Sequence, residues 1–135
     1  MKVLIDINVL LDVILERDPW VDAAVRLLAA VESNRIQGFA AGHTLTTIHY
    51  VTSRARDRDT AAAAVTDLLR LLEVVPIEKD DLHQALVLPM NDFEDAVQAA
   101  AALKIGADHL VTRNEKDFRG LSLPVTSPAT ALTLI

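Results

Sequence analysis

The sequence predicts an α/β fold, in which three layers (α/β/α) surround a mostly parallel central sheet of about five strands. Short β-branched runs alternate with segments of helical periodicity along the whole chain. Such alternation favours parallel strands joined by right-handed crossovers, with helices on both faces of the sheet. The chain has 135 residues, of which 51% are hydrophobic, which is enough for one core. We therefore expect a single domain over residues 1–135.

Composition narrows the class of protein. There is no cysteine, which excludes disulfides, thiolate metal sites and a cysteine nucleophile, and which fits a reducing cytoplasm. No apolar run approaches the ~18 residues that a membrane span needs, so we expect a cytoplasmic protein without a membrane partner. Residues 73–95 hold seven acids and one lysine, and this segment accounts for the whole net charge of −6. Such a cluster could hold a hard divalent cation.

The first strand is predicted at residues 3–5, a run that is too short and too β-branched for a helix. Asn8 is predicted to cap the helix that follows over residues 9–15. Asp6 then lies in the turn at the carboxyl end of the strand, which is where ligands bind in open α/β sheets. Asp6 is therefore either a functional ligand or a residue that only forms the turn.

The middle of the chain supplies further helices and two more strands. A helix is expected to begin at Pro19 and to run to about residue 33, and a second strand follows at 37–41. A helical face continues from 45 to 55, and an apolar stripe at 60–72 predicts core packing. The third strand is expected at 73–77, with Pro76 near its end.

The last third of the chain predicts an especially buried helix. A short helix at 81–88 precedes an alanine-rich helix that begins near Asn91 and runs to about Ile105, with Gly106 after its end. A fourth strand is expected at 109–112. A weak fifth strand at 123–126 and a last helix from Pro128 complete the chain.

Two later segments could carry chemistry together with Asp6. In Asp92-Phe93-Glu94-Asp95, Asp92 is expected as a helix N-cap, which explains Asp92 better than it explains Asp95. Their spacing of three puts Asp92 and Asp95 on one face of the helix, with Glu94 pointing elsewhere. The other segment, residues 112–118, follows the fourth strand and is either a solvated loop or a second group of functional polar residues.

These segments could converge at one edge of the sheet, because two follow strands and one opens a helix. Three or four carboxylates without cysteine or suitably spaced histidine favour a hard, oxygen-preferring ion such as Mg²⁺ or Mn²⁺. Such ions activate water and stabilise phosphate oxygens, which suits hydrolysis of a phosphodiester.

The three segments at residues 4–10, 92–96 and 111–118 resemble, in order and spacing, the motifs of the PIN-domain family, and most of all its VapC-like toxin ribonucleases. The resemblance spans nearly the whole chain. It implies a three-layer domain in which acids from separate motifs bind Mg²⁺ or Mn²⁺ and cleave RNA. It also implies a cognate antitoxin protein as partner and a homodimer.

The resemblance also implies roles for individual residues. The family's first acid matches Asp6, the acid that opens the later helix matches Asp95, and the last acid falls at Asn114 or Asp117. The implied catalytic residues are Asp6, Asp95 and Asp117. The implied metal ligands are Asp6, Asp92, Asp95, Asn114 and Asp117. The residues expected to contact the substrate are Thr112, Arg113 and Lys116.

The sequence departs from the family pattern at one important place. The family usually carries a glutamate in the helix after the second strand, near Thr46-Thr47-Ile48, but no acid occurs between Glu32 and Asp57. Either Asp92 replaces this glutamate, or the metal binds more weakly than in typical members. The alternative function is a PIN-like module that binds RNA or a protein without cleavage. A receiver-like domain is disfavoured because no aspartate follows the third strand.

Overall fold

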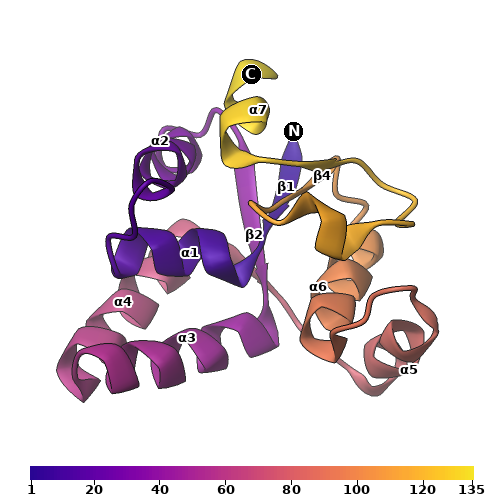
Figure 1. Cartoon of the computed structure of the whole chain (residues 1–135), viewed down its shortest axis with the longest axis horizontal. Helices are drawn as coiled ribbons and strands as arrows, with labels where there is room; N and C mark the ends of the chain where they lie inside the picture. Colours follow the sequence, from indigo (N-terminus) through magenta and orange to yellow (C-terminus); the bar gives the residue numbers. More distant parts are fainter.

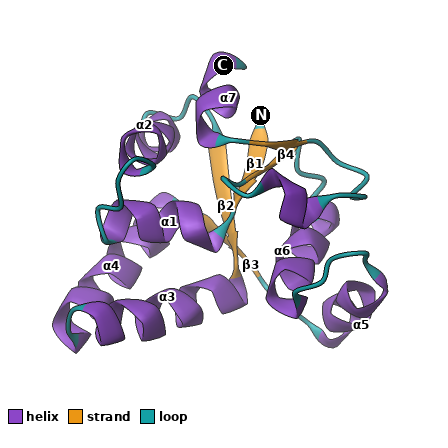
Figure 2. Ribbon diagram, in the orientation of Figure 1, coloured by secondary structure: helices purple, strands orange, loops and turns teal.

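The computed structural model of the protein describes residues 1–135 and contains five parallel strands in the order β3-β2-β1-β4-β5. Figure 2 shows the strands between helices that lie on both sides. The predicted three-layer fold with about five mostly parallel strands is therefore confirmed. The strands are β1 (Lys2–Ile5), β2 (Gln37–Ala41), β3 (Glu73–Val75), β4 (His109–Val111) and β5 (Val125–Thr126).

The helices divide between the two faces of the sheet (Figure 1). Helices α1 to α4 cover one face, α5 and α6 cover the other, and α7 lies at the end where both termini are found. None of these helices is long and apolar enough to cross a membrane. The helices are α1 (Ile7–Ile14), α2 (Val21–Glu32), α3 (Gly42–Ala55), α4 (Arg58–Leu71), α5 (Lys79–Val87), α6 (Phe93–Lys104) and α7 (Pro128–Thr133), and a short 3₁₀ helix, η1, spans Glu115–Phe118.

Strand β1 supplies the centre of both cores, because successive side chains of a strand point to opposite faces. Val3 and Ile5 lie in the core under α1 to α4, whereas Leu4 lies in the core under α6. Helix α6 packs closely on the sheet through a run of small side chains, and residues 96–102 are all buried. The alanine-rich helix is thus among the most buried elements, as the sequence predicts.

The sheet changes its direction of winding at β1, which pairs with β2 on one side and with β4 on the other. Ile5 is aligned with Val111, and the Asp6 N–H donates to the Val111 carbonyl oxygen at 2.9 Å. Asp6 and Thr112 therefore leave the carboxyl ends of two adjacent strands together. A topological switch point of this kind is where open α/β sheets form a crevice for a ligand.

Two predicted helix starts are wrong. Helix α1 begins at Ile7, so Asp6 and not Asn8 stands at the N-cap position, with φ −62° and ψ 145°. The Asp6 carbonyl already accepts from the Val9 N–H at 3.0 Å, which places Asn8 inside the first turn. Helix α2 begins at Val21 and not at Pro19, because a turn carries the chain to Val21, whose N–H donates to Arg17.

Leu110 tests the central position of β4. Its side chain is fully buried in the core under α6, so we expect Leu110→Ala to lower the free energy of unfolding by about 2–5 kcal/mol. Urea unfolding measures this change. Leu82→Ala on the exposed side of α5 is the control, since Leu82 is 41% exposed and should cost clearly less. Equal losses for the two variants would contradict the assignment of β4 to the core.

Candidate active site

The carboxylate of Asp6 is buried at the switch point, and only 2% of the residue is exposed. Each of its oxygens accepts one hydrogen bond from a fully buried side chain. Gln98 Nε2 donates to Oδ1 at 2.8 Å, and Thr112 Oγ1 donates to Oδ2 at 2.9 Å. The other end of the Gln98 amide accepts from the Ile7 N–H at 3.0 Å. These bonds fix the orientation of Asp6, so this carboxylate makes no side-chain bond that caps α1.

Burial raises the pKa of the Asp6 carboxyl, although the hydrogen bonds from Gln98 and Thr112 partly oppose this effect. Removing a carboxylate from water disfavours its charged form unless a positive charge lies nearby. No lysine or arginine bonds to Asp6, whose partners are both neutral. A cation beside Asp6 would therefore stabilise the ionised carboxylate.

The start of α6 brings two further acids to the same place. Asp92 caps the helix, and its Oδ1 accepts from the Asp95 N–H at 2.9 Å, as the sequence predicts. The pKa of Asp95 is raised to about 7, first by burial and then by the charges of Asp92, Asp6, Asp117 and Glu94. Acids from the turn after β1, from the start of α6 and from η1 thus act on one carboxyl group.

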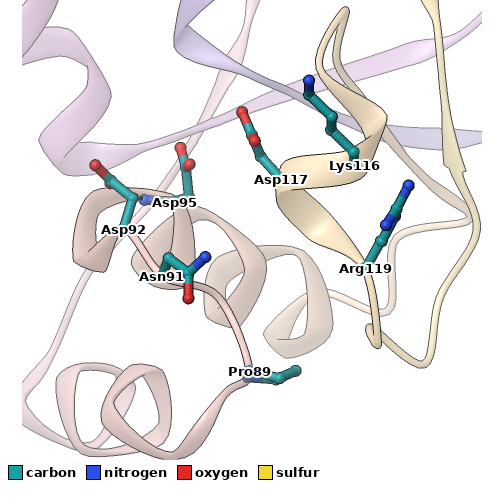
Figure 3. A pocket seen from close by; sticks show the side chains of 7 residues that line it. All are labelled: Pro89, Asn91, Asp92, Asp95, Lys116, Asp117 and Arg119. Carbon is teal, nitrogen blue, oxygen red and sulfur yellow. Dashed lines mark hydrogen bonds between the residues drawn. The ribbon is translucent and has the colours of Figure 1, made fainter.

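An acidic cleft of about 420 Å³ lies in front of Asp95. Figure 3 shows the carboxylates of Asp92, Asp95 and Asp117 projecting to the same side of this cleft, with Lys116 beyond Asp117. Apart from Pro89, every residue that lines it is polar or charged. The lining residues are Pro89, Asn91, Asp92, Asp95, Lys116, Asp117 and Arg119. The cleft thus combines several carboxylates with two cations on the η1 side.

The chemistry of the donors fits a hard divalent ion. The side chains that gather here offer carboxylate and amide oxygens, which Mg²⁺ and Mn²⁺ prefer, and the cleft has no histidine in its lining. No three acidic or histidine side chains are yet close enough together to form a coordination sphere. The carboxylates around Asp95 repel one another, and a bound cation would offset that repulsion.

Two residues expected to contact the substrate lie elsewhere. Thr112 is fully buried and donates to Asp6, so it orients this carboxylate and cannot reach a bound polymer. Arg113 Nε donates to Asp12 Oδ2 at 2.8 Å, and its guanidinium lies 3.9 Å from the centroid of the Trp20 ring. Arg113 is thus held between α1 and α2. The sequence could not indicate these contacts, because Asp6, Asp12 and Trp20 are distant from Thr112 and Arg113 along the chain.

In the segment after β4, Asn114 starts the 3₁₀ helix, whereas Lys116 and Asp117 line the cleft. Asn114 donates its N–H to Thr112 Oγ1 at 3.0 Å, and its carbonyl oxygen accepts from the Asp117 N–H at 3.0 Å. These bonds start η1 and turn Asp117 and Lys116 into the cleft, which the Asn114 side chain does not line. Of the two positions open for the family's last acid, the structure brings Asp117 to Asp95.

Two residues near the cleft were missed from the sequence. Gln98 is a single polar side chain in the buried alanine run, and that anomaly was the available signal. Arg119 lines the cleft, but nothing in its local pattern marks it. Glu94 points away from the face of Asp92 and Asp95, as expected, since it does not line the cleft and its Oε2 accepts from Thr47 Oγ1 at 3.1 Å. The α3 helix that contains Thr47 therefore reaches the start of α6.

The fold and the cleft define an α/β/α domain whose acids gather where the sheet changes its direction of winding. The chain belongs to the PIN domain family, whose model matches residues 2–116. The predicted resemblance is confirmed at the level of the family.

Known proteins similar to this chain cover most of its length. Ribonuclease VapC1 of Aquifex aeolicus is 28% identical over 122 residues, covering 87% of this chain and 83% of the relative. The structure of VapBC2 from Rickettsia felis, bound to a promoter DNA fragment, superposes with a TM-score of 0.73 at 18% identity, covering 93% and 97% of the two chains. A toxin–antitoxin complex from Klebsiella pneumoniae gives 0.69 at 22% identity, with the same coverage.

Gln98 tests how Asp6 is held. Gln98→Leu removes the donor to Asp6 and leaves the buried Ile7 N–H without its acceptor, so we expect the free energy of unfolding to fall by about 2–4 kcal/mol. Chemical denaturation measures this loss. Gln84→Leu on the exposed side of α5 is the matched control and should change stability by less than about 1 kcal/mol.

Asp95 tests the electrostatics of the cleft through pH. Its pKa of about 7 in the fold, against 3.8 for the ordinary group, means that the folded state binds the proton more tightly. The associated stability is present below about pH 4 and is lost as the pH rises through about 7. We expect metal-free Asp95→Asn to exceed the wild type in unfolding free energy by roughly 1–2 kcal/mol at about pH 8, after allowance for solvent screening.

Thermal unfolding at several pH values measures this difference, which should disappear at about pH 4. Asp80→Asn, in the exposed first turn of α5, is the control and should show no comparable gain at high pH. A wild-type chain that is no less stable than Asp95→Asn at high pH would contradict the clustering of charge at Asp95.

Proposed function

We propose that the protein is a metal-dependent endoribonuclease that hydrolyses RNA phosphodiester bonds and acts as the toxin of a toxin–antitoxin pair. The observation that carries the proposal is the convergence of the Asp6, Asp92 and Asp117 charges on Asp95 beside an open polar cleft. Membership of the PIN domain family supports it, as does the similarity to a relative named as a ribonuclease.

The proposed catalytic carboxylates are Asp6, Asp95 and Asp117, which also act as metal ligands. Asp92 is the further oxygen donor proposed beside them, whereas Asn114, whose side chain does not line the cleft, acts through its backbone to start η1. A bound Mg²⁺ or Mn²⁺ supplies an activated water and balances the charge of the phosphate oxygens. Asp6 is the rigid member of this set, because Gln98 and Thr112 hold both of its oxygens. Asp117 is exposed and can adjust its position when substrate enters.

Lys116 and Arg119 are the proposed contacts to the RNA backbone. Both line the acidic cleft and come from the segment that carries Asp117. Cations at this place attract phosphates toward the carboxylates, in a protein whose overall charge of −6 would otherwise repel nucleic acid. Arg113 is not part of this proposal, because Asp12 and Trp20 already engage its guanidinium.

A cognate antitoxin is the proposed protein partner. The solved structures that share this fold include a toxin–antitoxin complex and a VapBC2 assembly on promoter DNA. We also propose that the chain forms a homodimer. Size measurement of the chain alone and with its antitoxin separates these two associations.

Cleavage of RNA in the presence of Mn²⁺ or Mg²⁺ tests the proposed activity. We expect Asp6→Asn to lower the cleavage rate at least about 100-fold, because it removes the buried negative charge from the proposed metal site. Excess EDTA should abolish cleavage by the wild type. Asp80→Asn, remote from the cleft, is the control and should retain the wild-type rate.

The same assay separates the nuclease from the alternative module. An RNA- or protein-binding module without activity would show no metal-dependent cleavage at any protein concentration, and Asp6→Asn would leave its binding unchanged. Undiminished cleavage by Asp6→Asn, or in EDTA, would contradict the proposed metal-dependent mechanism.

A further inference from the structure

Helix α3 lacks the acid that the PIN family usually places there. The position expected for a glutamate falls at Thr46, Thr47 and Ile48. Ile48 is fully buried in the core, and Thr46 Oγ1 donates back to the carbonyl oxygen of His43 in the same helix at 2.8 Å. Of these three side chains, only that of Thr47 makes a hydrogen bond to another element.

The partner of Thr47 is a carboxylate from α6. Thr47 Oγ1 lies 3.1 Å from Glu94 Oε2 and 3.2 Å from the carbonyl oxygen of His43, so its single proton is shared between these acceptors. A second contact joins the same two helices, since His43 Nε2 lies 3.2 Å from the Glu94 carbonyl oxygen. The first turns of α3 and α6 are thus connected at Glu94.

Glu94 also lies next to the group that holds Asp6. Glu94 and Gln98 are four residues apart and share one face of α6. Thr44 of α3 reaches Gln98 at 3.5 Å, in parallel with the contact from Thr47 to Glu94. This face of α6 presents Gln98 to Asp6, and one helical turn earlier it presents a carboxylate at the start of the helix that carries Asp95.

Asp92 is less suited to replace the missing glutamate. One of its oxygens already accepts a hydrogen bond from the Asp95 N–H, and the residue is exposed at the N-terminal end of α6. Glu94 is half-buried, and none of its carboxylate oxygens is used to cap its own helix. The acid that faces α3 is therefore Glu94.

We propose that Glu94 provides, from α6, the carboxylate that α3 provides in typical PIN domains, and that Thr47 is the residue that positions it. The inference rests on the proposed function, because it concerns the same divalent-cation site. It explains both the absence of an acid from α3 and the presence of a threonine at position 47. A glutamate at position 47 would face Glu94 and repel it, whereas a threonine hydroxyl donates to it.

Calorimetric titration of the metal-free full chain with MnCl₂ tests the proposal. We expect Glu94→Gln to weaken Mn²⁺ binding about 10- to 100-fold relative to the wild type. Asp6→Asn serves as the reference for loss of the site. Glu32→Gln, at the exposed end of α2, is the matched control and should bind Mn²⁺ as the wild type does.

The outcomes distinguish this inference from the function on which it rests. If the wild type binds no Mn²⁺ at millimolar concentration, the proposed metal-dependent function fails. If the wild type binds, Asp6→Asn does not, and Glu94→Gln matches the wild type within about twofold, only the role of Glu94 is overturned. A weakened Glu94→Gln beside an unaffected Glu32→Gln supports it.

Thr47 variants separate positioning from packing. Thr47→Ser keeps the hydroxyl and should retain Mn²⁺ affinity, whereas Thr47→Val keeps the shape and should weaken binding several-fold. Equal affinities for Thr47→Ser and Thr47→Val would overturn the positioning role.

A swap of the two side chains and a labelled wild type complete the test. The double variant Thr47→Glu/Glu94→Thr returns the carboxylate to α3 and should bind Mn²⁺ more tightly than Glu94→Gln does. If Glu94→Gln fails to fold, Mg²⁺ titration of wild-type protein with ¹³C-labelled glutamate side chains decides the matter. The Glu94 carboxyl signal should then shift with Mg²⁺ saturation, and an unmoved signal would overturn the proposal.

Discussion

The buried carboxylate of Asp6 is the constraint on which the rest of the site depends. Its two oxygens are held by Gln98 of α6 and by Thr112 after β4, so one side chain joins three elements of the fold. A carboxylate in this environment is costly unless every acceptor is satisfied. The close packing of the alanine-rich α6 on the sheet brings Gln98 within reach. The fold thereby fixes one acid firmly in the interior, while Asp117 is exposed at the surface of the cleft.

The order and type of the elements could be predicted from the sequence, because periodicity and β-branched runs are local signals. The sequence also predicts that the segments around Asp6, Asp92–Asp95 and residues 112–118 converge at one edge of the sheet, since parallel strands end on the same side. The particular acids Asp95 and Asp117 were indicated by the family resemblance, which left Asn114 as the alternative to Asp117. The start of α1 was misplaced by two residues because Asn8 and Asp6 are both good caps. In the structure the Asp6 carbonyl oxygen accepts the first hydrogen bond of the helix, so Asp6 stands at the N-cap position.

Contacts between distant segments could not be predicted in this way. Arg113 stands beside the acidic loop in sequence, yet its guanidinium is held by Asp12 and Trp20. Asp12 is almost fully buried and also pairs with Arg17. Arg113 therefore helps to stabilise the buried charge of Asp12 in α1. Glu94 points away from the face of Asp92 and Asp95, as the helix-face argument predicts, but that argument could not indicate its partner Thr47 in the neighbouring α3. Both side chains are placed by partners that no local pattern contains.

The wide separation of the Asp6 partners bears on the order in which the protein is made. Gln98 and Thr112 follow Asp6 by 92 and 106 residues, and Asp117 follows later still. During synthesis the first acid leaves the ribosome long before the side chains that orient it exist. A partly made chain therefore has no assembled acidic site. For a protein proposed to cut RNA, the topology itself delays assembly of the site until the segment that carries Asp117 has been synthesised.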